Sequence, residues 1–117
     1  MPTEKNPETT ISSPVVVVAT FTVKPESVPA VRALCTKAVE HVHTEPGCQL
    51  YCLHETADNT FVFVEQWADA DALKAHSSAP AAGELFAGIR EHLAGAPDIK
   101  MLQPVPAGEA AKGRLRA

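Results

Sequence analysis

The chain lacks any long apolar run. Its longest uninterrupted apolar stretch, Val15 to Ala19, is far too short to cross a bilayer, which takes about 20 residues in a helix. The opening letters, MPTEKNPETTISSP, contain no apolar core behind a basic start, so they do not resemble a secretion signal. Together these absences predict a soluble, cytoplasmic protein with no membrane partner.

Concentrated positive charge is also missing. The sequence has 10 Lys and Arg residues against 14 Asp and Glu residues, for a formal net charge of −4 at pH 7. Because phosphate binding needs a concentrated basic face, we expect no nucleic-acid partner. The local basic excess is confined to Lys112, Arg114 and Arg116. We interpret it as a short solvated arm, with contact to an anionic partner as the alternative.

Cysteines are few and odd in number. Cys35, Cys48 and Cys52 are too sparse for a disulfide framework, so we expect a reducing compartment and no structural disulfide. Cys48 and Cys52 are predicted to share a strand face with His54. Four residues of extended chain would nevertheless hold the two thiols roughly 13 Å apart, which is too far for one ion. We therefore expect no metal site.

Motifs for the common cofactors and nucleophiles are absent as well. The chain contains no GxGxxG, no phosphate-binding GxxxxGK[ST] loop and no GxSxG nucleophile elbow. Nucleotide-dependent, flavin-dependent and serine-hydrolase functions therefore have no motif to support them.

What the sequence does contain is one domain of alternating strands and helices. Residues 1–13, rich in Pro, Thr, Ser, Glu and Asn, are predicted to form a disordered N-terminal segment, and residues 106–117 a flexible tail. Between them, residues 14–105 form the predicted domain, with strands at 15–23, 48–56, 60–68 and 98–105 and helices at about 28–42, 70–77 and 80–94. This order predicts an α+β, ferredoxin-like fold, a four-stranded antiparallel sheet with helices on one face.

The third strand has two apolar faces. Its alternation places one set of side chains on one side, Phe61, Phe63, Glu65 and Trp67, and Val62 and Val64 on the other. Helices cover only one face of such a sheet, and each Val-sized side chain left in water forfeits roughly 1.5–3 kcal/mol. A second copy of the chain is the simplest cover, so we predict a homodimer.

A small-molecule site is predicted between sheet and helices. Leu73 and His76 are three residues apart on the short helix, so Leu73 anchors the helix and His76 turns inward with it. There the imidazole can meet Trp67, with Arg90 of the last helix within reach. An apolar pocket with a few polar groups is the usual form of a ligand site. Alternatively, His76 and Trp67 are core residues, and Glu65 pairs with Arg90 or holds the imidazole.

Three stretches carry a resemblance to a known family. The sequence resembles the antibiotic biosynthesis monooxygenase (ABM) family in VVVVATFTVKPES, at residues 15–27 before the first predicted helix, in EPGCQLY, at residues 45–51, and in FVFVEQWADADALKAHSSAP, at residues 61–80. Its members show an EPG-C-x-x-Y turn into a strand, and an E-x-W followed nine residues later by an inward His. The resemblance spans about residues 14–105, and the matching residues are Glu45, Pro46, Gly47, Cys48, Tyr51, Glu65, Trp67, Leu73 and His76.

The resemblance implies a dimeric alpha-beta barrel that oxidises a quinol or polyphenol with molecular oxygen and without metal, flavin or haem. An electron-rich phenol, once deprotonated, can itself pass an electron to oxygen, so the protein supplies a dry cavity and a base. Carried over, His76 is the proton-handling residue and Trp67 a wall of the cavity, the two catalytic positions. The implied substrate-binding residues are Glu65, Tyr51, Phe63, Leu73, Phe86 and Arg90.

Other functions of this fold remain open at this point. Haem-degrading relatives pair an Asn on the first strand with the Trp and His, but the strand here reads VVVVATFTV, without Asn. Relatives that isomerise phosphorylated signals need a basic cradle that the sequence lacks. A non-catalytic ligand-binding or sensor dimer is a further alternative, as is a structural dimerisation module whose cavity Trp67 and Phe86 would fill.

Overall fold

The computed structural model describes residues 13–116, so all of the predicted disordered segment except Ser13 lies outside the described residues. The elements are β1 (Val15–Thr22), α2 (Val28–Val42), β2 (Cys48–Glu55), β3 (Thr60–Trp67), α3 (Ala70–Ser77), α4 (Pro80–Ile89) and β4 (Asp98–Leu102), with short 3₁₀ turns η1 (Pro25–Ser27) and η2 (Arg90–His92). None of the helices in this part of the chain is long and apolar enough to cross a membrane.

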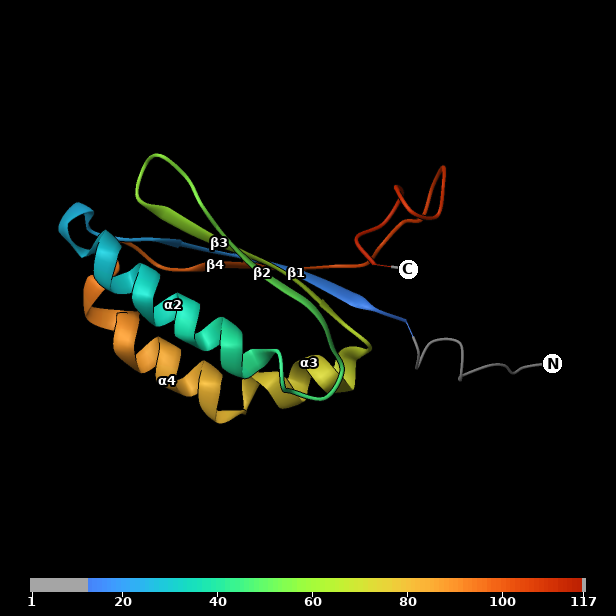
Figure 1. Ribbon diagram of the computed structural model, residues 1–117, viewed down its shortest axis with the longest axis horizontal. Helices are drawn as coiled ribbons and strands as arrows, with labels where there is room; N and C mark the ends of the chain where they lie inside the picture. Colours follow the sequence, from blue (N-terminus) through green and yellow to red (C-terminus); the bar gives the residue numbers. More distant parts are fainter. Residues whose placement is uncertain (1–12, 117) are drawn as a thin grey trace.

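The four strands form one antiparallel sheet in the order β2-β3-β1-β4. All three α-helices lie on the same side of this sheet (Figure 1). The predicted ferredoxin-like fold is therefore confirmed. Two elements are shorter than predicted. The last helix leaves α-geometry after Ile89, because Leu93 pairs with Val23 in a β-bridge. Strand β4 ends at Leu102, two residues before Pro104, which has no N–H to donate.

The core lies between the helices and the inner face of the sheet. Strand register places Phe61 opposite Phe21, and Glu65 opposite Val17, so the odd-numbered residues of β1 and β3 face the helices. From α2, residues spaced three and four apart pack against them. The helical core residues are Val31, Cys35, Ala38 and Val42 on α2 and Ala81, Leu85 and Ile89 on α4.

An irregularity at the start of β2 corrects one expectation. The register shifts between Cys48 and Leu50, so Cys48 lies opposite Trp67 on the inner face, whereas Cys52 lies opposite Val64 on the outer face. Cys52 and His54, opposite Val64 and Val62, share the outer face as predicted. The prediction is wrong for Cys48, because an extra residue in the strand reverses the alternation. All three cysteines are free thiols, and burial raises the pKa of Cys35 to about 11.

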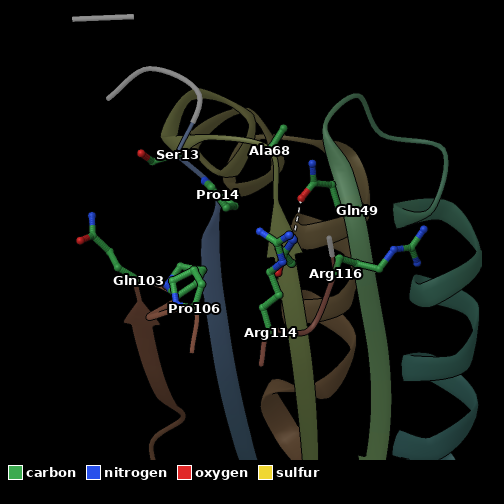
Figure 2. Close-up of a pocket in the computed structure, with 10 residues that line it drawn as sticks. Ser13, Pro14, Gln49, Ala68, Gln103, Pro106, Arg114 and Arg116 are labelled. Carbon is green, nitrogen blue, oxygen red and sulfur yellow. Dashed lines mark hydrogen bonds between the residues drawn. The ribbon is translucent and has the colours of Figure 1, made fainter. Parts of the chain in front are cut away.

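The outer face of the sheet, formed by the even-numbered residues of β1 and β3, is partly covered by the chain itself. Residues 103–116, which contain no helix or strand, lie on the side of the sheet opposite the helices (Figure 1). Arg114 and Arg116 line a pocket of about 470 Å³ with Gln66 and Gln49 (Figure 2). Gln66 is only 2% exposed, and its amide donates a hydrogen bond to Gln49 Oε1 over 2.8 Å. Residues 103–116, called the C-terminal segment below, therefore cover the Gln66 end of this face.

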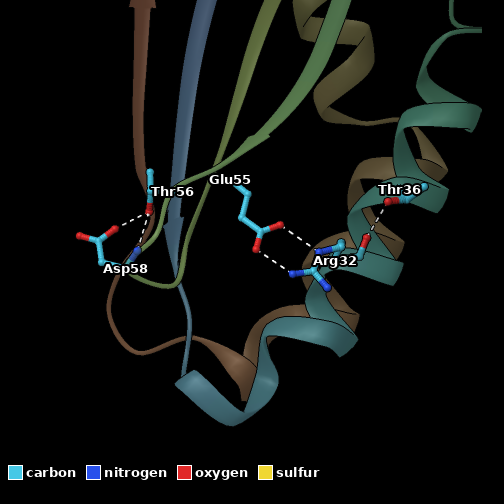
Figure 3. Close-up of polar contacts among 5 residues, drawn as sticks. All are labelled: Arg32, Thr36, Glu55, Thr56 and Asp58. Atoms are coloured by element: carbon cyan, nitrogen blue, oxygen red, sulfur yellow. Dashed lines mark hydrogen bonds and ion pairs between the residues drawn. The ribbon is translucent and has the colours of Figure 1, made fainter.

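At the opposite end of the domain, an ion pair joins helix α2 to strand β2. Arg32 on α2 donates from Nε and Nη2 to the two carboxylate oxygens of Glu55, at 2.9 and 2.7 Å (Figure 3). These hydrogen bonds hold the pKa of Glu55 below its usual range. Beyond Glu55, Thr56 bonds to Asp58 in the β2–β3 hairpin. The pair fixes α2 along the sheet, although exposed pairs of this kind contribute little stability.

The turn before β2 requires glycine. Gly47 has a φ of +81°, and a Cβ there would come within 2.5 Å of the Ala72 Cβ on α3. Gly47→Ala is therefore expected to lower the free energy of unfolding by about 2–4 kcal/mol, through left-handed strain and a backbone-imposed clash. Urea denaturation monitored by circular dichroism measures this loss. As the control, Gly83→Ala in α4 should be neutral or stabilising, because a Cβ there would meet no atom within 4 Å apart from the neighbouring backbone of its own helix.

Candidate functional site

A cavity of about 140 Å³ lies between the inner face of the sheet and the helices α3 and α4. The sheet supplies its floor, and the two helices supply its roof. Six residues predicted from the sequence line it together: Tyr51, Phe63, Glu65, Leu73, His76 and Phe86. The space is not filled by Trp67 and Phe86, which was the arrangement expected of a purely structural module.

His76 is held in place on three sides. Asp69 caps α3 by accepting a hydrogen bond from the Ala72 N–H over 2.8 Å, and the helix then carries His76 in its last turn. The imidazole stacks on the Trp67 indole, with ring centroids 4.5 Å apart and an angle of 28° between the planes. The Tyr51 ring meets it edge-on at 5.6 Å. Its orientation is therefore fixed before any ligand arrives.

A third contact of the His76 ring, with Glu45, defines its chemistry. Nδ1 lies 2.8 Å from Glu45 Oε1, and the His76 and Glu45 side chains are only 11% and 14% exposed. A carboxylate can only accept hydrogen bonds, so in this pair Nδ1 carries the proton. Within residues 13–116, Nε2 has no hydrogen-bond partner. The ring nitrogen that remains available to a ligand in the cavity is Nε2.

Glu45 is the site residue that sequence reasoning missed. It was noticed only as the first letter of the EPG turn that links α2 to β2. The close approach of Gly47 to Ala72 seats this turn against α3, and His76 follows one helical turn after Ala72. The sequence contains one signal for this role, a carboxylate immediately before a Pro-Gly turn in a chain that also has an inward-facing His.

Trp67 supports the site from behind rather than lining the cavity. It is fully buried and is absent from the lining residues, so its expected role as a wall of the cavity does not match its position. Its Nε1 donates a hydrogen bond to Glu65 Oε1 over 3.0 Å. Trp67 therefore orients two cavity residues, His76 by stacking and Glu65 by hydrogen bonding.

Burial sets the ionisation of the two polar residues on the cavity floor. Glu65 is 4% exposed, and this burial raises its pKa, while the Trp67 hydrogen bond and the nearby His76 oppose the shift. Burial likewise raises the pKa of the Tyr51 phenol, and the neighbouring Glu65 adds to the effect. Tyr51 is therefore a neutral hydroxyl at pH 7, and burial favours the protonated form of Glu65.

The structure does not bring Arg90 to the cavity. Arg90 is exposed and is not among the lining residues, because α4 ends at Ile89 and the chain turns into the 3₁₀ segment Arg90–His92. Nor does any group of three or more His, Cys, Asp or Glu side chains in residues 13–116 have an arrangement that could hold a metal ion.

The raised pKa of Glu65 predicts a pH-dependent stability. Between its ordinary value of 4.5 and its raised value, the folded state binds more protons than the unfolded state, so stability falls as the pH rises through this window. Glu65→Gln keeps an oxygen for the Trp67 N–H and removes the titration. We expect the variant to be more stable than the wild type at pH 8, with a smaller difference at pH 4. Urea denaturation at both pH values measures the difference in the free energy of unfolding between the variant and the wild type. A difference of equal size at pH 4 and pH 8 would contradict this prediction.

Comparison with other proteins places the chain in a family. The family model for antibiotic biosynthesis monooxygenase matches residues 14–88. The Mycobacterium tuberculosis protein named "Putative monooxygenase Rv0793" is 35% identical over 71 residues, 60% of this chain and 70% of that protein. A Synechocystis protein, sll1783, is 34% identical over 90 residues, 75% of this chain, and the match spans 61% of its own length.

Solved structures agree with the fold. The structure of Rv0793 superimposes with a TM-score of 0.77 at 30% identity, covering 83% of this chain and 100% of that one. A Caulobacter crescentus protein called a "putative antibiotic biosynthesis monooxygenase" gives a TM-score of 0.76 at 28% identity, with 84% and 95% covered. The matched segment contains the whole His76, Glu45, Trp67 and Glu65 arrangement. This chain belongs to the antibiotic biosynthesis monooxygenase family.

Proposed function

We propose that the protein is a cofactor-independent monooxygenase that oxidises a small aromatic hydroxy compound, a quinol or polyphenol, with molecular oxygen. The observation that carries this proposal is the imidazole of His76, fixed at Nδ1 by Glu45 and offering Nε2 to an aromatic-walled cavity. The family name and the name of the Mycobacterium tuberculosis relative support the reaction class.

The first step is removal of a proton from the substrate. A hydroxyl group placed between Nε2 of His76 and the Glu65 carboxyl group gives up its proton to Nε2. The positive charge that develops on the imidazole is stabilised by Glu45, whose Oε1 is 2.8 Å from Nδ1. Because most of the cavity wall is apolar, the phenolate that forms there is poorly solvated and is a stronger electron donor than in water.

The second step is reaction with oxygen. The phenolate passes one electron to oxygen, and the resulting radical and superoxide combine at a ring carbon to form a C–O bond. The proton held by His76 returns to the distal peroxide oxygen, which gives a hydroperoxide. The hydrogen on the same ring carbon then leaves as a proton, its electron pair forms the C=O bond, the O–O bond breaks, and the distal oxygen departs with that proton as water. For a hydroquinone, the sum is one quinol and one oxygen molecule giving one hydroxyquinone and one water. The four electrons that reduce the oxygen molecule all come from the substrate.

Oxygen uptake by metal-stripped protein tests the proposal. The protein is dialysed against a chelator and supplied with a panel of quinols under ¹⁸O₂. We expect oxygen and quinol to be consumed in equal amounts, with one ¹⁸O atom in the product. A requirement for added metal or flavin, or a product without ¹⁸O, would reject the mechanism. Tight retention of a quinol without turnover would instead indicate a non-catalytic binding protein.

We further propose that the protein is a homodimer. The half-buried Val18, Val62 and Val64 form an apolar strip on the outer face of the sheet, continued on β4 by Leu102, which is 44% exposed. The C-terminal segment covers only the Gln66 end of the outer face. We therefore assign a second copy of the chain as the occupant of the apolar strip. Sedimentation velocity should give about twice the 12.4 kDa chain mass at micromolar concentration. A single species at the chain mass would reject the dimer.

A further inference from the structure

The volume of the cavity restricts the ligands that it can take. An apolar cavity of about 150 Å³ in another protein accommodates benzene, and the cavity here measures about 140 Å³. When a cavity is filled to the density of a protein interior, about three quarters of its volume is atoms, which leaves roughly 100 Å³ for the ligand. This is enough for one aromatic ring with small substituents, whereas a fused second ring would have to extend out of the cavity past its exposed lining residues, Phe86 and Ile99.

Two ionisable groups of the cavity, Glu65 and His76, lie away from its exposed apolar residues. Glu65 is 4% exposed and the His76 side chain 11%, whereas Phe86 and Ile99, which also line the cavity, are 39% and 51% exposed. A ligand that enters between Phe86 and Ile99 places its hydroxyl group at the inner end. The ring itself must then lie within the apolar middle of the cavity, where the space is limited.

The floor of the cavity is rigid, and its size is set by the helical side. Phe63 packs against Tyr51 with ring centroids 4.9 Å apart and edge-on against Phe21 at 6.0 Å, and all three side chains come from hydrogen-bonded strands. Phe86 comes from α4 and meets Phe21 edge-on at 5.8 Å. Of the aromatic walls, Phe86 is the one that is exposed and not anchored in the sheet. Its ring therefore limits how wide a ligand can be.

We propose that the site selects dihydroxybenzenes with a single ring over fused two-ring and three-ring quinols, and that Phe86 sets this limit. The inference rests on the proposed function in so far as that function identifies the ligand as an aromatic hydroxy compound. It concerns binding, however, and holds or fails independently of whether oxygen reacts.

Anaerobic binding of a graded series tests the size limit. The probes are methylhydroquinone, 2-methyl-1,4-naphthohydroquinone and 9,10-anthrahydroquinone, and the readouts are calorimetry and the fluorescence of Trp67, the single tryptophan of the chain, which stacks on His76. We expect the one-ring probe to bind at least about tenfold more tightly than the two-ring probe. Burial of apolar area alone predicts the reverse order, because the larger rings bury more surface. Equal or reversed affinities, or no binding of methylhydroquinone, would overturn the proposal.

A pair of variants tests the role of Phe86. Phe86→Ala should bring the affinity for the naphthohydroquinone to within about threefold of that for methylhydroquinone. Leu34→Ala is the matched control, since Leu34 packs against α4 at Gly88 without lining the cavity, and the tenfold preference should persist in it. An unchanged preference in a folded Phe86→Ala protein would show that this ring does not set the limit.

Oxygen uptake, recorded separately, distinguishes this proposal from the function on which it rests. Preferential binding of the one-ring probe without uptake would reject the oxygenase activity and leave the size limit standing. Equal rates of oxygen consumption at limiting concentrations of the one-ring and two-ring quinols would support the activity and reject the size limit.

Discussion

Replacing His76 by alanine is expected to lower kcat for quinol oxidation by roughly 10²–10⁴-fold, the usual contribution of a positioned general base. The loss corresponds to about 3–5 kcal/mol of transition-state stabilisation. Its cause is local, because Nε2 of His76 is the unprotonated nitrogen that the Glu45 contact leaves available to the cavity. Steady-state oxygen uptake with a saturating quinol measures the effect.

Two controls separate a lost base from a damaged fold. Added imidazole can occupy the space left by the side chain, so it should restore part of the activity of His76→Ala and leave the wild type unchanged. His41→Ala removes a histidine from the exposed surface of α2 and should retain full activity. Activity of His76→Ala equal to that of the wild type would remove His76 from the mechanism. A loss of activity that imidazole does not rescue would be consistent with a structural role alone.

Much of the site could be predicted from the sequence because it depends on short-range periodicity. The alternation of β3 places Glu65 and Trp67 two residues apart on one face, and the helical spacing of α3 orients Leu73 and His76 together. Both rules hold whatever the rest of the chain does. They are sufficient to place His76 and Trp67 in contact once the helices are known to cover that face.

What could not be predicted depends on contacts between distant segments. Glu45 and His76 are 31 residues apart, and their bond exists because the EPG turn packs against α3. Whether Trp67 lines the cavity or lies behind it is decided by the His76 ring stacked over it. Arg90 was placed by extending the period of α4 beyond the point where the helix ends. For Glu45 and Trp67 the sequence indicates the direction of the side chain but not the segment that meets it, and for Arg90 the direction itself depends on where the helix ends.

The contact between Glu45 and His76 leads to the second large effect. Glu45→Gln is expected to lower kcat by roughly 10–10³-fold with little change in KM, because Glu45 orients the imidazole and balances its charge without lining the cavity. The loss is smaller than for His76→Ala because the Gln side-chain oxygen can still accept a hydrogen bond from the Nδ1–H of His76. Glu84→Gln, an exposed substitution of the same kind on α4, should leave both constants unchanged.

A spectroscopic measurement shows whether Glu45 acts through the imidazole. In the wild type, the carboxylate accepts a hydrogen bond from Nδ1, so ¹⁵N NMR of the neutral His76 ring should show the proton on Nδ1 alone. The amide of Glu45→Gln can present either its oxygen or its NH₂ group, so both neutral tautomers become populated. The fraction of molecules with Nε2 unprotonated falls, and kcat should fall with it. A variant that loses activity while the proton stays on Nδ1 would show that the charge of Glu45, rather than its hold on the tautomer, supports the reaction.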